Sequence, residues 1–212
     1  MRTCTFERCP YSEDEVLFSK SEITFSPGLT VLVGCNGAGK TSMLHQIRDA
    51  LDKSQGEFIL YYDNLRDGRS AARDVAARSG RYDVLATMIS SSEGEELVVD
   101  FGQFAASIKR FIARNKESMR DLWVLLDGVD SGVSIDNIVD MKQFIADVLS
   151  PDLAAQNICL YVVIAANSYE MCRDERCLDV ASGKYVRFES YEEYKAFILK
   201  SAEVKSLRYM NC

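Results

Sequence analysis

The residues with the clearest chemical signature lie at positions 34–41, which read Gly-Cys-Asn-Gly-Ala-Gly-Lys-Thr. A glycine, four residues and then Gly-Lys-Ser/Thr is the spacing of a loop that binds phosphate groups. Glycines let several backbone N–H groups converge on one phosphate, and a following helix adds its unpaired N-terminal donors. We expect the following residues to contact a nucleotide: Asn36, Gly37, Ala38, Gly39, Lys40, Thr41 and Ser42.

The flanks of this loop supply the context that the motif requires. Residues 29–33 form a short apolar, β-branched run that predicts a buried strand, and residues 41–51 carry apolar side chains at helical spacing. A glycine-rich turn with a chance lysine is the simpler alternative, and the order strand, loop, helix disfavours it. The Lys40 ammonium would then neutralise the outer phosphates, and the Thr41 hydroxyl would hold Mg²⁺.

A second chemical landmark is the apolar run 123–127, which ends in the carboxylate of Asp127. We expect this strand to lie next to the loop strand, so that Asp127 holds Mg²⁺ beside Thr41 through water. A strand that merely ends at an acidic turn is the alternative. Thr41 and Asp127 are therefore the predicted metal ligands.

The remaining elements predict an α/β fold. Short strands are expected at 2–6, 22–25, 58–62 and 158–166, the last two buried, with a hairpin at 177–180 and 184–188. Helices are expected from Ser92, whose spacing to Glu95 is that of a capping box, and at 135–149 and 191–205. We predict one domain, 1–212, with a mostly parallel core sheet flanked by helices. Its parts are an N-terminal antiparallel β part (1–33), the loop and its helix (34–56), a helical region (57–120) and a core with a terminal hairpin and helix (121–212).

Composition restricts the setting and the chemistry. The net charge of −7 disfavours general binding to nucleic acid or anionic membranes, although a local basic patch remains compatible with it. Seven cysteines without a framework spacing suit a reducing compartment, and one histidine disfavours a zinc site. No signal peptide and no run of 18 apolar residues is visible, so we expect a cytoplasmic chain without membrane attachment.

Together these motifs resemble those of the ATP-binding-cassette (ABC) ATPases, above all soluble heads of the chromosome-maintenance and recombination-repair type and small AAA ATPases of bacteria and phages. The resemblance rests on residues 28–41 and on residues 125–127 followed by 130–132. It also rests on residues 91–95, which look like a degenerate form of the family's signature motif. It implies ATP and Mg²⁺ as ligands and a homodimer that closes around ATP. Ser92 and Gly94 would then touch the γ-phosphate bound to the opposite protomer.

The departures from that family predict slow chemistry. The family has a glutamate after the magnesium aspartate and a histidine after a later strand, where this chain has Gly128 and Asn167. Loss of a general base lowers a rate by ~10²–10⁴-fold. Asp130 is the candidate substitute base, and Asn167 occupies the histidine position. The family's glutamine has no evident match, and Asp63 or Asn64 stands near its place.

Three functions are compatible with these residues. The first is an ATP-gated dimeric ATPase that acts on nucleic acid or a protein partner. The second is a nucleotide-sensing module with negligible turnover, which leaves open whether the chain is an enzyme. A transporter motor is disfavoured because the span from Lys40 to Asp127 is short. Cys35 lies inside the loop, so oxidation could block nucleotide binding, although a small residue filling a tolerant position is the simpler interpretation.

Overall fold

The structure is a computed structural model, and it describes residues 1–11, 16–51, 57–63, 103–104, 106–108, 110–115, 119–148 and 158–210. The predicted signature residues Ser92 and Gly94, and Asn64, lie outside the described residues. The strands are β1 (Arg2–Thr5), β2 (Glu22–Phe25), β3 (Gly28–Val33), β4 (Glu57–Asp63), β5 (Asp121–Asp127), β6 (Cys159–Ala165), β7 (Cys177–Asp179) and β8 (Lys184–Val186). The helices are α1 (Lys40–Leu51), α6 (Ile135–Val148), α8 (Tyr169–Cys172) and α9 (Tyr191–Met210), and residues within 103–115 are also helical.

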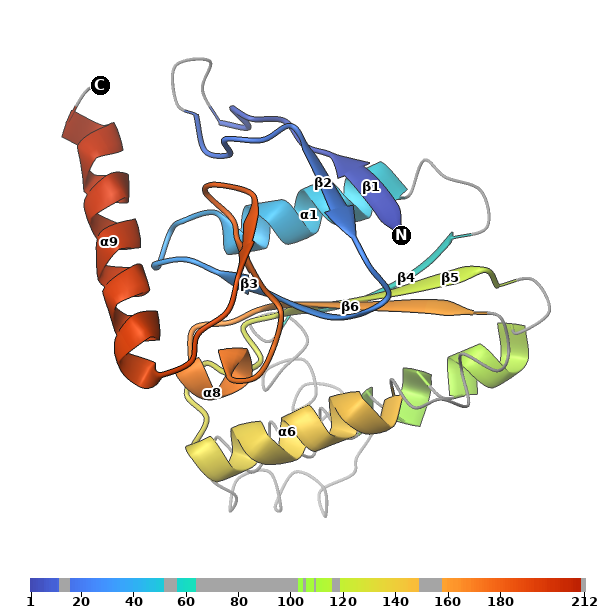
Figure 1. Cartoon of the computed structure of the whole chain (residues 1–212). Coiled ribbons are helices and arrows are strands. Elements are labelled where there is room, and N and C mark those ends of the chain that lie inside the picture. Colours follow the sequence, from blue (N-terminus) through green and yellow to red (C-terminus); the bar gives the residue numbers. More distant parts are fainter. Residues whose placement is uncertain are drawn as a thin grey trace, which may run out of the picture.

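Six strands form one sheet in the order β4-β5-β6-β3-β7-β8 (Figure 1). All neighbouring strands are parallel except β7 and β8, which form the predicted antiparallel hairpin. The strands β1 and β2 pair separately and antiparallel. A mostly parallel sheet with flanking helices and an N-terminal antiparallel pair is the fold class that the sequence predicted, that of a P-loop NTPase.

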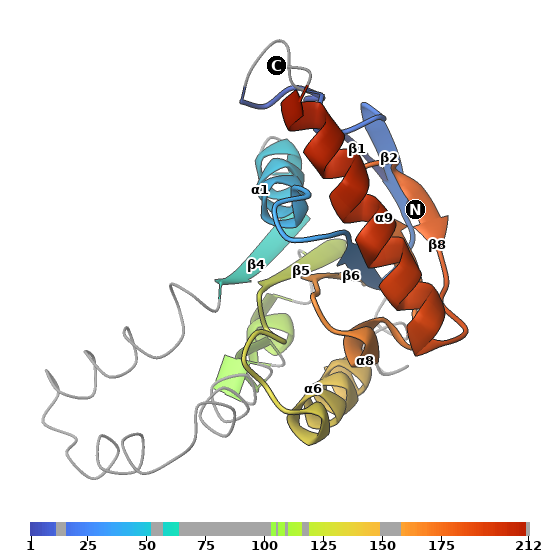
Figure 2. The same cartoon turned by 90° about the vertical axis from the view of Figure 1, so that its left-hand side faces the viewer.

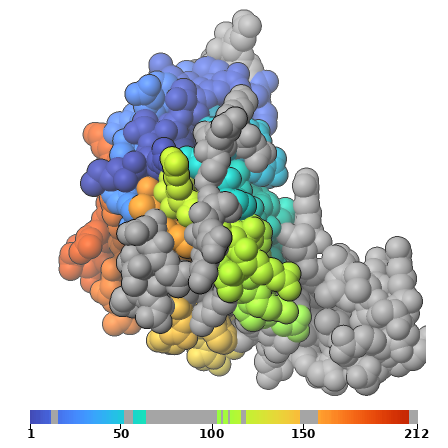
Figure 3. All heavy atoms as spheres, turned by 90° about the vertical axis from the view of Figure 1, so that its right-hand side faces the viewer, coloured from blue at the N-terminus to red at the C-terminus, as the bar shows by residue number. Residues whose placement is uncertain are grey.

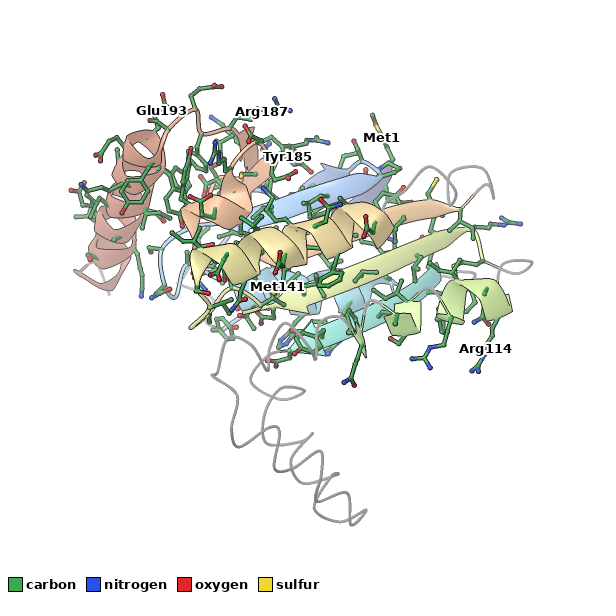
Figure 4. The ribbon with its side chains drawn as sticks, turned by 90° about the horizontal axis from the view of Figure 1, so that it is seen from below. Met1, Arg114, Met141, Tyr185, Arg187 and Glu193 are labelled. Atoms are coloured by element: carbon green, nitrogen blue, oxygen red, sulfur yellow. The ribbon has the colours of Figure 1, made fainter. Side chains whose placement is uncertain are left out.

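Both faces of the sheet are covered, which explains the continuous apolar runs in β5 and β6. On one face, α1 and the β1–β2 pair cover Trp123, which stacks on Tyr161 with ring centroids 4.3 Å apart. On the other face, α6, α8 and the helical residues within 103–115 cover the alternate side chains of the same strands (Figure 1). Met141 of α6 is fully buried between its helix and the sheet (Figure 4).

The structure corrects the predicted burial in two elements. The strand β4 was expected to be buried, yet five of its seven residues are only half-buried, because β4 is the last strand of the described sheet. In α6, Ile135 and Val139 are 64% and 53% exposed, so the apolar face is narrower than its apolar residues suggest. Ile138, Met141 and Ile145 form the part that packs on the sheet.

The two ends of the sheet differ in chemistry. At the end where the strands begin, the N-terminal segment lies beside the starts of β4 and β5 (Figure 3). There Arg2 forms ion pairs with Glu57 and Asp121, which tie β1 to the main sheet. The opposite end, where β3, β5 and β6 finish, carries the glycine-rich loop and faces the viewer in Figure 2. In the described part of the chain, no helix has the length and apolar character needed to cross a bilayer.

Candidate functional site

A pocket of about 610 Å³ opens where the parallel strands end, and the predicted chemical residues gather around it. Strand ends of an open α/β sheet are where such folds bind ligands. The pocket is lined by Tyr11, Leu17, Asn36, Gly37, Gly39, Lys40, Thr41, Ser42, Asp63, Asp127, Gly128, Ser131, Ala165 and Asn167. Six of the seven loop residues predicted to contact nucleotide are in this set. The seventh, Ala38, is buried, and its N–H donates to Cys35 O over 3.0 Å.

The loop between β3 and α1 has the backbone that its glycines permit. Gly37 and Gly39 have φ angles of 75° and 102°, a conformation that other residues rarely adopt. A Cβ atom on Gly39 would also lie 2.9 Å from Leu17 Cδ2, so a side chain there would displace the neighbouring segment. Cys35 is only 6% exposed, which places its thiol beneath the loop surface.

Lys40 is buried at the start of α1, with its ammonium turned back into the loop. Its Nζ donates to Gly34 O over 2.8 Å and to Cys35 O over 3.3 Å. Burial lowers the pKa of Lys40, and the negative charges of Asp130 and Asp127 oppose this decrease. A cation held only by carbonyl dipoles in a buried position is well placed to bind an anionic group, because phosphate oxygens satisfy it better than carbonyls do.

Thr41 and Asp127 meet at the mouth of the pocket, as predicted, but by a different route. The strand β5 was expected next to β3, and this was wrong, because β6 lies between them. The helix α1 packs on β5 and β6, which carries its first residues across the end of β6. The Thr41 hydroxyl consequently lies beside the Asp127 carboxylate, where it lowers the pKa of that carboxyl.

Asp127 faces a second carboxylate on the neighbouring strand. In the parallel register of β4 and β5, Asp63 pairs directly with Asp127, and both line the pocket. Burial raises the pKa of Asp127, the neighbouring Thr41 hydroxyl lowers it, and the charge of Asp63 adds to the increase. Carboxylate and hydroxyl oxygens at this position suit Mg²⁺, which is held by one or two protein carboxylates together with nucleotide phosphates and water. Among the described residues, no group of three or more His, Cys, Asp or Glu side chains could hold a metal alone.

Asp130 and Asn167 lie together, although they are 37 positions apart in the chain. Asp130 Oδ2 accepts hydrogen bonds from the backbone N–H groups of Asn167 and Ser168, each over 2.7 Å. Asn167 Nδ2 donates to Ser131 Oγ over 3.4 Å, so three hydrogen bonds join the loop after β5 to the loop after β6. Asp130 is 5% exposed, and within the described residues its Oδ1 has no hydrogen-bond partner. Gly128 lines the pocket with no side chain to offer.

Several residues of the site escaped the sequence-based prediction, and three of them make hydrogen bonds to the loop or to α1. Tyr11 lines the pocket and is 73% exposed, and its hydroxyl shares a hydrogen bond with Ser42 Oγ. Ser201 and Lys205 of α9 contact the backbone of the loop from its outer side. An aromatic residue in a polar segment and two polar residues in a terminal helix leave no local pattern, so only the fold identifies them.

Comparisons with known proteins identify a family and a similar solved structure. The family model described as an AAA domain matches residues 17–204. A search of curated proteins gives no match. One similar solved structure is an ATP-binding cassette of an ABC transporter, MJ1267, in its ADP conformation. It is 12% identical over 87% of this chain and 89% of that one, with a TM-score of 0.41.

Proposed function

The chain belongs to the AAA-domain family of P-loop ATPases, and from this premise we propose the finer function that its site supports best. It is a Mg-ATP-binding head of the ABC type that dimerises around ATP and hydrolyses it slowly. Its work is done on nucleic acid or on a protein partner. The observation that carries the proposal is the meeting of Lys40, Thr41 and Asp127 at one pocket.

Each residue of the pocket has a part in binding. The N–H groups of the loop and the Lys40 ammonium would hold the β- and γ-phosphates, since Asn36, Gly37, Gly39 and Lys40 line one pocket. Thr41 and Asp127 hold Mg²⁺, which when bound would neutralise charge on the phosphate oxygens. The exposed ring of Tyr11, which is anchored to Ser42, offers a flat apolar surface for the base.

Turnover is slow because position 128, directly after Asp127, carries no carboxylate that could act as the base for the water. In hydrolysis, the water oxygen bonds to the γ-phosphorus, the bond from that phosphorus to ADP breaks, and a water proton must leave. Gly128 cannot accept that proton, and Asn167 is a neutral amide. Asp130, which is buried behind Asn167 and does not itself line the pocket, is the proposed substitute acceptor of that proton. Its Oδ2 already accepts hydrogen bonds from the N–H groups of Asn167 and Ser168, so Asp130 also orients Asn167 in the site.

The proposal is tested by measuring ATP affinity and phosphate release together, with and without Mg²⁺ and with and without DNA. We expect micromolar or tighter Mg-ATP binding with turnover well below ~1 s⁻¹, the low end of typical enzyme rates. Absence of ATP binding at millimolar nucleotide would overturn the proposal. Binding with no measurable turnover under any of these conditions would favour the second candidate, a nucleotide sensor. Gly128 is the observation that favours this candidate, because it stands where the family has its catalytic glutamate.

A further inference from the structure

The C-terminal helix α9 crosses in front of the strand ends and contacts the site from outside the pocket (Figure 2). Sequence patterning predicts it only as a closing helix. Three of its polar side chains reach the backbone of two loops that line the pocket: Tyr194, Ser201 and Lys205. None of these side chains is itself part of the lining.

The first contact is with the phosphate loop. Ser201 Oγ accepts the N–H of Cys35 over 3.1 Å, and Lys205 Nζ donates to Asn36 O over 2.8 Å. Ser201 and Lys205 are one helical turn apart and so share a face of α9. The loop and the helix touch closely here, because a Cβ atom on Gly37 would lie 2.5 Å from Lys205 Nζ. Gly37 is therefore needed for two reasons: its φ angle permits the backbone turn, and its missing side chain leaves room for Lys205 of α9.

The second contact is with the loop after β6. Tyr194 Oη donates to Asn167 O over 2.8 Å, and its ring packs against Phe188 and Tyr169. Tyr194 is 6% exposed, so this hydroxyl is fixed by its surroundings. Asn167 is in turn bound to Ser131 and Asp130, so the contact extends to the loop after β5.

These contacts share one face of one helix, since positions 194, 201 and 205 follow the spacing i, i+7, i+11. A helix is stiff over three turns, so it fixes the distance between the loops that it touches. We propose that Tyr194, Ser201 and Lys205 are positioning residues through which α9 sets the phosphate loop and Asn167 at the separation that a bound triphosphate requires. The inference rests on the proposed function, because it assumes that ATP occupies the pocket.

The two contacts should have separable effects. Ser201 and Lys205 hold the loop curled before nucleotide arrives, so their loss adds an ordering cost to binding. We expect Ser201→Ala and Lys205→Met each to weaken ATP binding about threefold to tenfold, the range of one net hydrogen bond. Tyr194→Phe keeps the ring and removes only the bond to Asn167 O. It should lower kcat several-fold and leave the affinity for ATP within a factor of two.

The experiment uses the full chain and matched controls on the same helix. Lys200→Met and Tyr191→Phe remove the same groups from exposed positions, and Lys205→Arg should restore the affinity that Lys205→Met loses. Amide hydrogen exchange at Cys35 supplies a readout independent of turnover, since Ser201→Ala should accelerate it without nucleotide. Adding ATP should slow exchange in residues 34–41 and in α9 together, and Lys205→Met should confine the slowing to the loop.

The possible failures are distinguishable. If the wild type binds no ATP, the proposed function fails and this inference falls with it. If the wild type binds ATP but Ser201→Ala, Lys205→Met and their controls agree in affinity, and Cys35 exchanges at the same rate in all of them, the positioning role of α9 is wrong. The inference would also be wrong if Tyr194→Phe lowered the affinity for ATP and kcat by the same factor and its Trp123 fluorescence were that of a partly unfolded chain. Tyr194 would then serve only the stability of the fold.

Discussion

At the residue scale, the site combines one cation, Lys40, with three carboxylates, so its formal charge is negative before any ligand arrives. Lys40, Asp63 and Asp130 are buried at the end of one sheet, and Asp127 is half-buried there. Electrostatic effects are larger at such positions than at the surface, because solvent screens them less. The next two predictions therefore each remove or neutralise one charge, and ATP affinity and turnover are the properties expected to change.

The first prediction concerns Lys40. Lys40→Ala should weaken ATP binding by ~10–100-fold, because a hydrogen bond to a charged group contributes about 1.5–3 kcal/mol. Titration with a fluorescent ATP analogue measures the loss. Lys20→Ala is the matched control, since Lys20 also donates to a glycine carbonyl, at Gly183, and does not line the pocket. Equal affinities for Lys40→Ala and the wild type would remove Lys40 from the phosphate site.

The second prediction separates the acidic residues. Asp130→Asn keeps an oxygen that can accept the N–H groups of Asn167 and Ser168, so the fold should persist, and we expect turnover to fall at least ~10-fold with little change in ATP affinity. Asp127→Asn should instead remove the enhancement of ATP binding by Mg²⁺. Phosphate release and ATP titrations with and without Mg²⁺ measure both. Turnover that survives in Asp130→Asn but collapses in Asp127→Asn would mean that another base exists, and Asp63, opposite Asp127, would be the residue to test.

At the element scale, the strands and helices position these residues by rules that are only partly local. The loop, α1, β5 and β6 were predictable, because their apolar runs and glycine spacing are encoded in adjacent residues. The order β5-β6-β3 was not, since neighbours in a sheet are chosen by packing between distant segments. The contacts of Tyr11 and α9 with the loop join residues up to 169 positions apart and leave no periodic signal.

The third prediction uses the stacked rings of β5 and β6. Burial, and then the charge of Asp121, raise the pKa of Tyr161 from its ordinary value of 10 to about 12. Between these values the unfolded chain has lost a proton that the folded chain keeps, so the free energy of unfolding should fall as pH rises from 10 to 12. Urea unfolding, followed by the fluorescence of Trp123, the single tryptophan, measures this slope.

Two variants assign the slope to Tyr161. Tyr161→Phe should reduce it, whereas Tyr11→Phe removes an exposed phenol and should not. Burial also raises the pKa values of Cys4, Tyr185 and Tyr194, so these groups would leave a residual slope in Tyr161→Phe. An unchanged slope in Tyr161→Phe would show that the phenol does not keep its proton in the folded chain.

At the scale of the whole molecule, the nucleotide pocket is open at one end of the sheet. Its lining comes from Tyr11 and Leu17, loop 34–39, the start of α1, the ends of β4, β5 and β6, and the loops after β5 and β6. Under the proposed function, a second protomer closes over the nucleotide in this pocket. Two chains of net charge −7 repel one another, so nucleotide and Mg²⁺ have to supply the attraction.

The last prediction is that ATP with Mg²⁺ shifts the chain from monomer to dimer, while ADP does not. Slow hydrolysis should let the dimer persist long enough for sizing by light scattering. Lys40→Ala should stay monomeric at ATP concentrations that just saturate the wild type, because its ~10–100-fold weaker binding leaves most copies without the nucleotide that joins them. Repulsion between the acidic protomers is screened by salt, so moderate salt should leave the dimer intact or favour it. An unchanged mass at high protein and saturating ATP, in a chain shown by titration to bind ATP, would remove dimerisation from the proposed mechanism and retain the binding site.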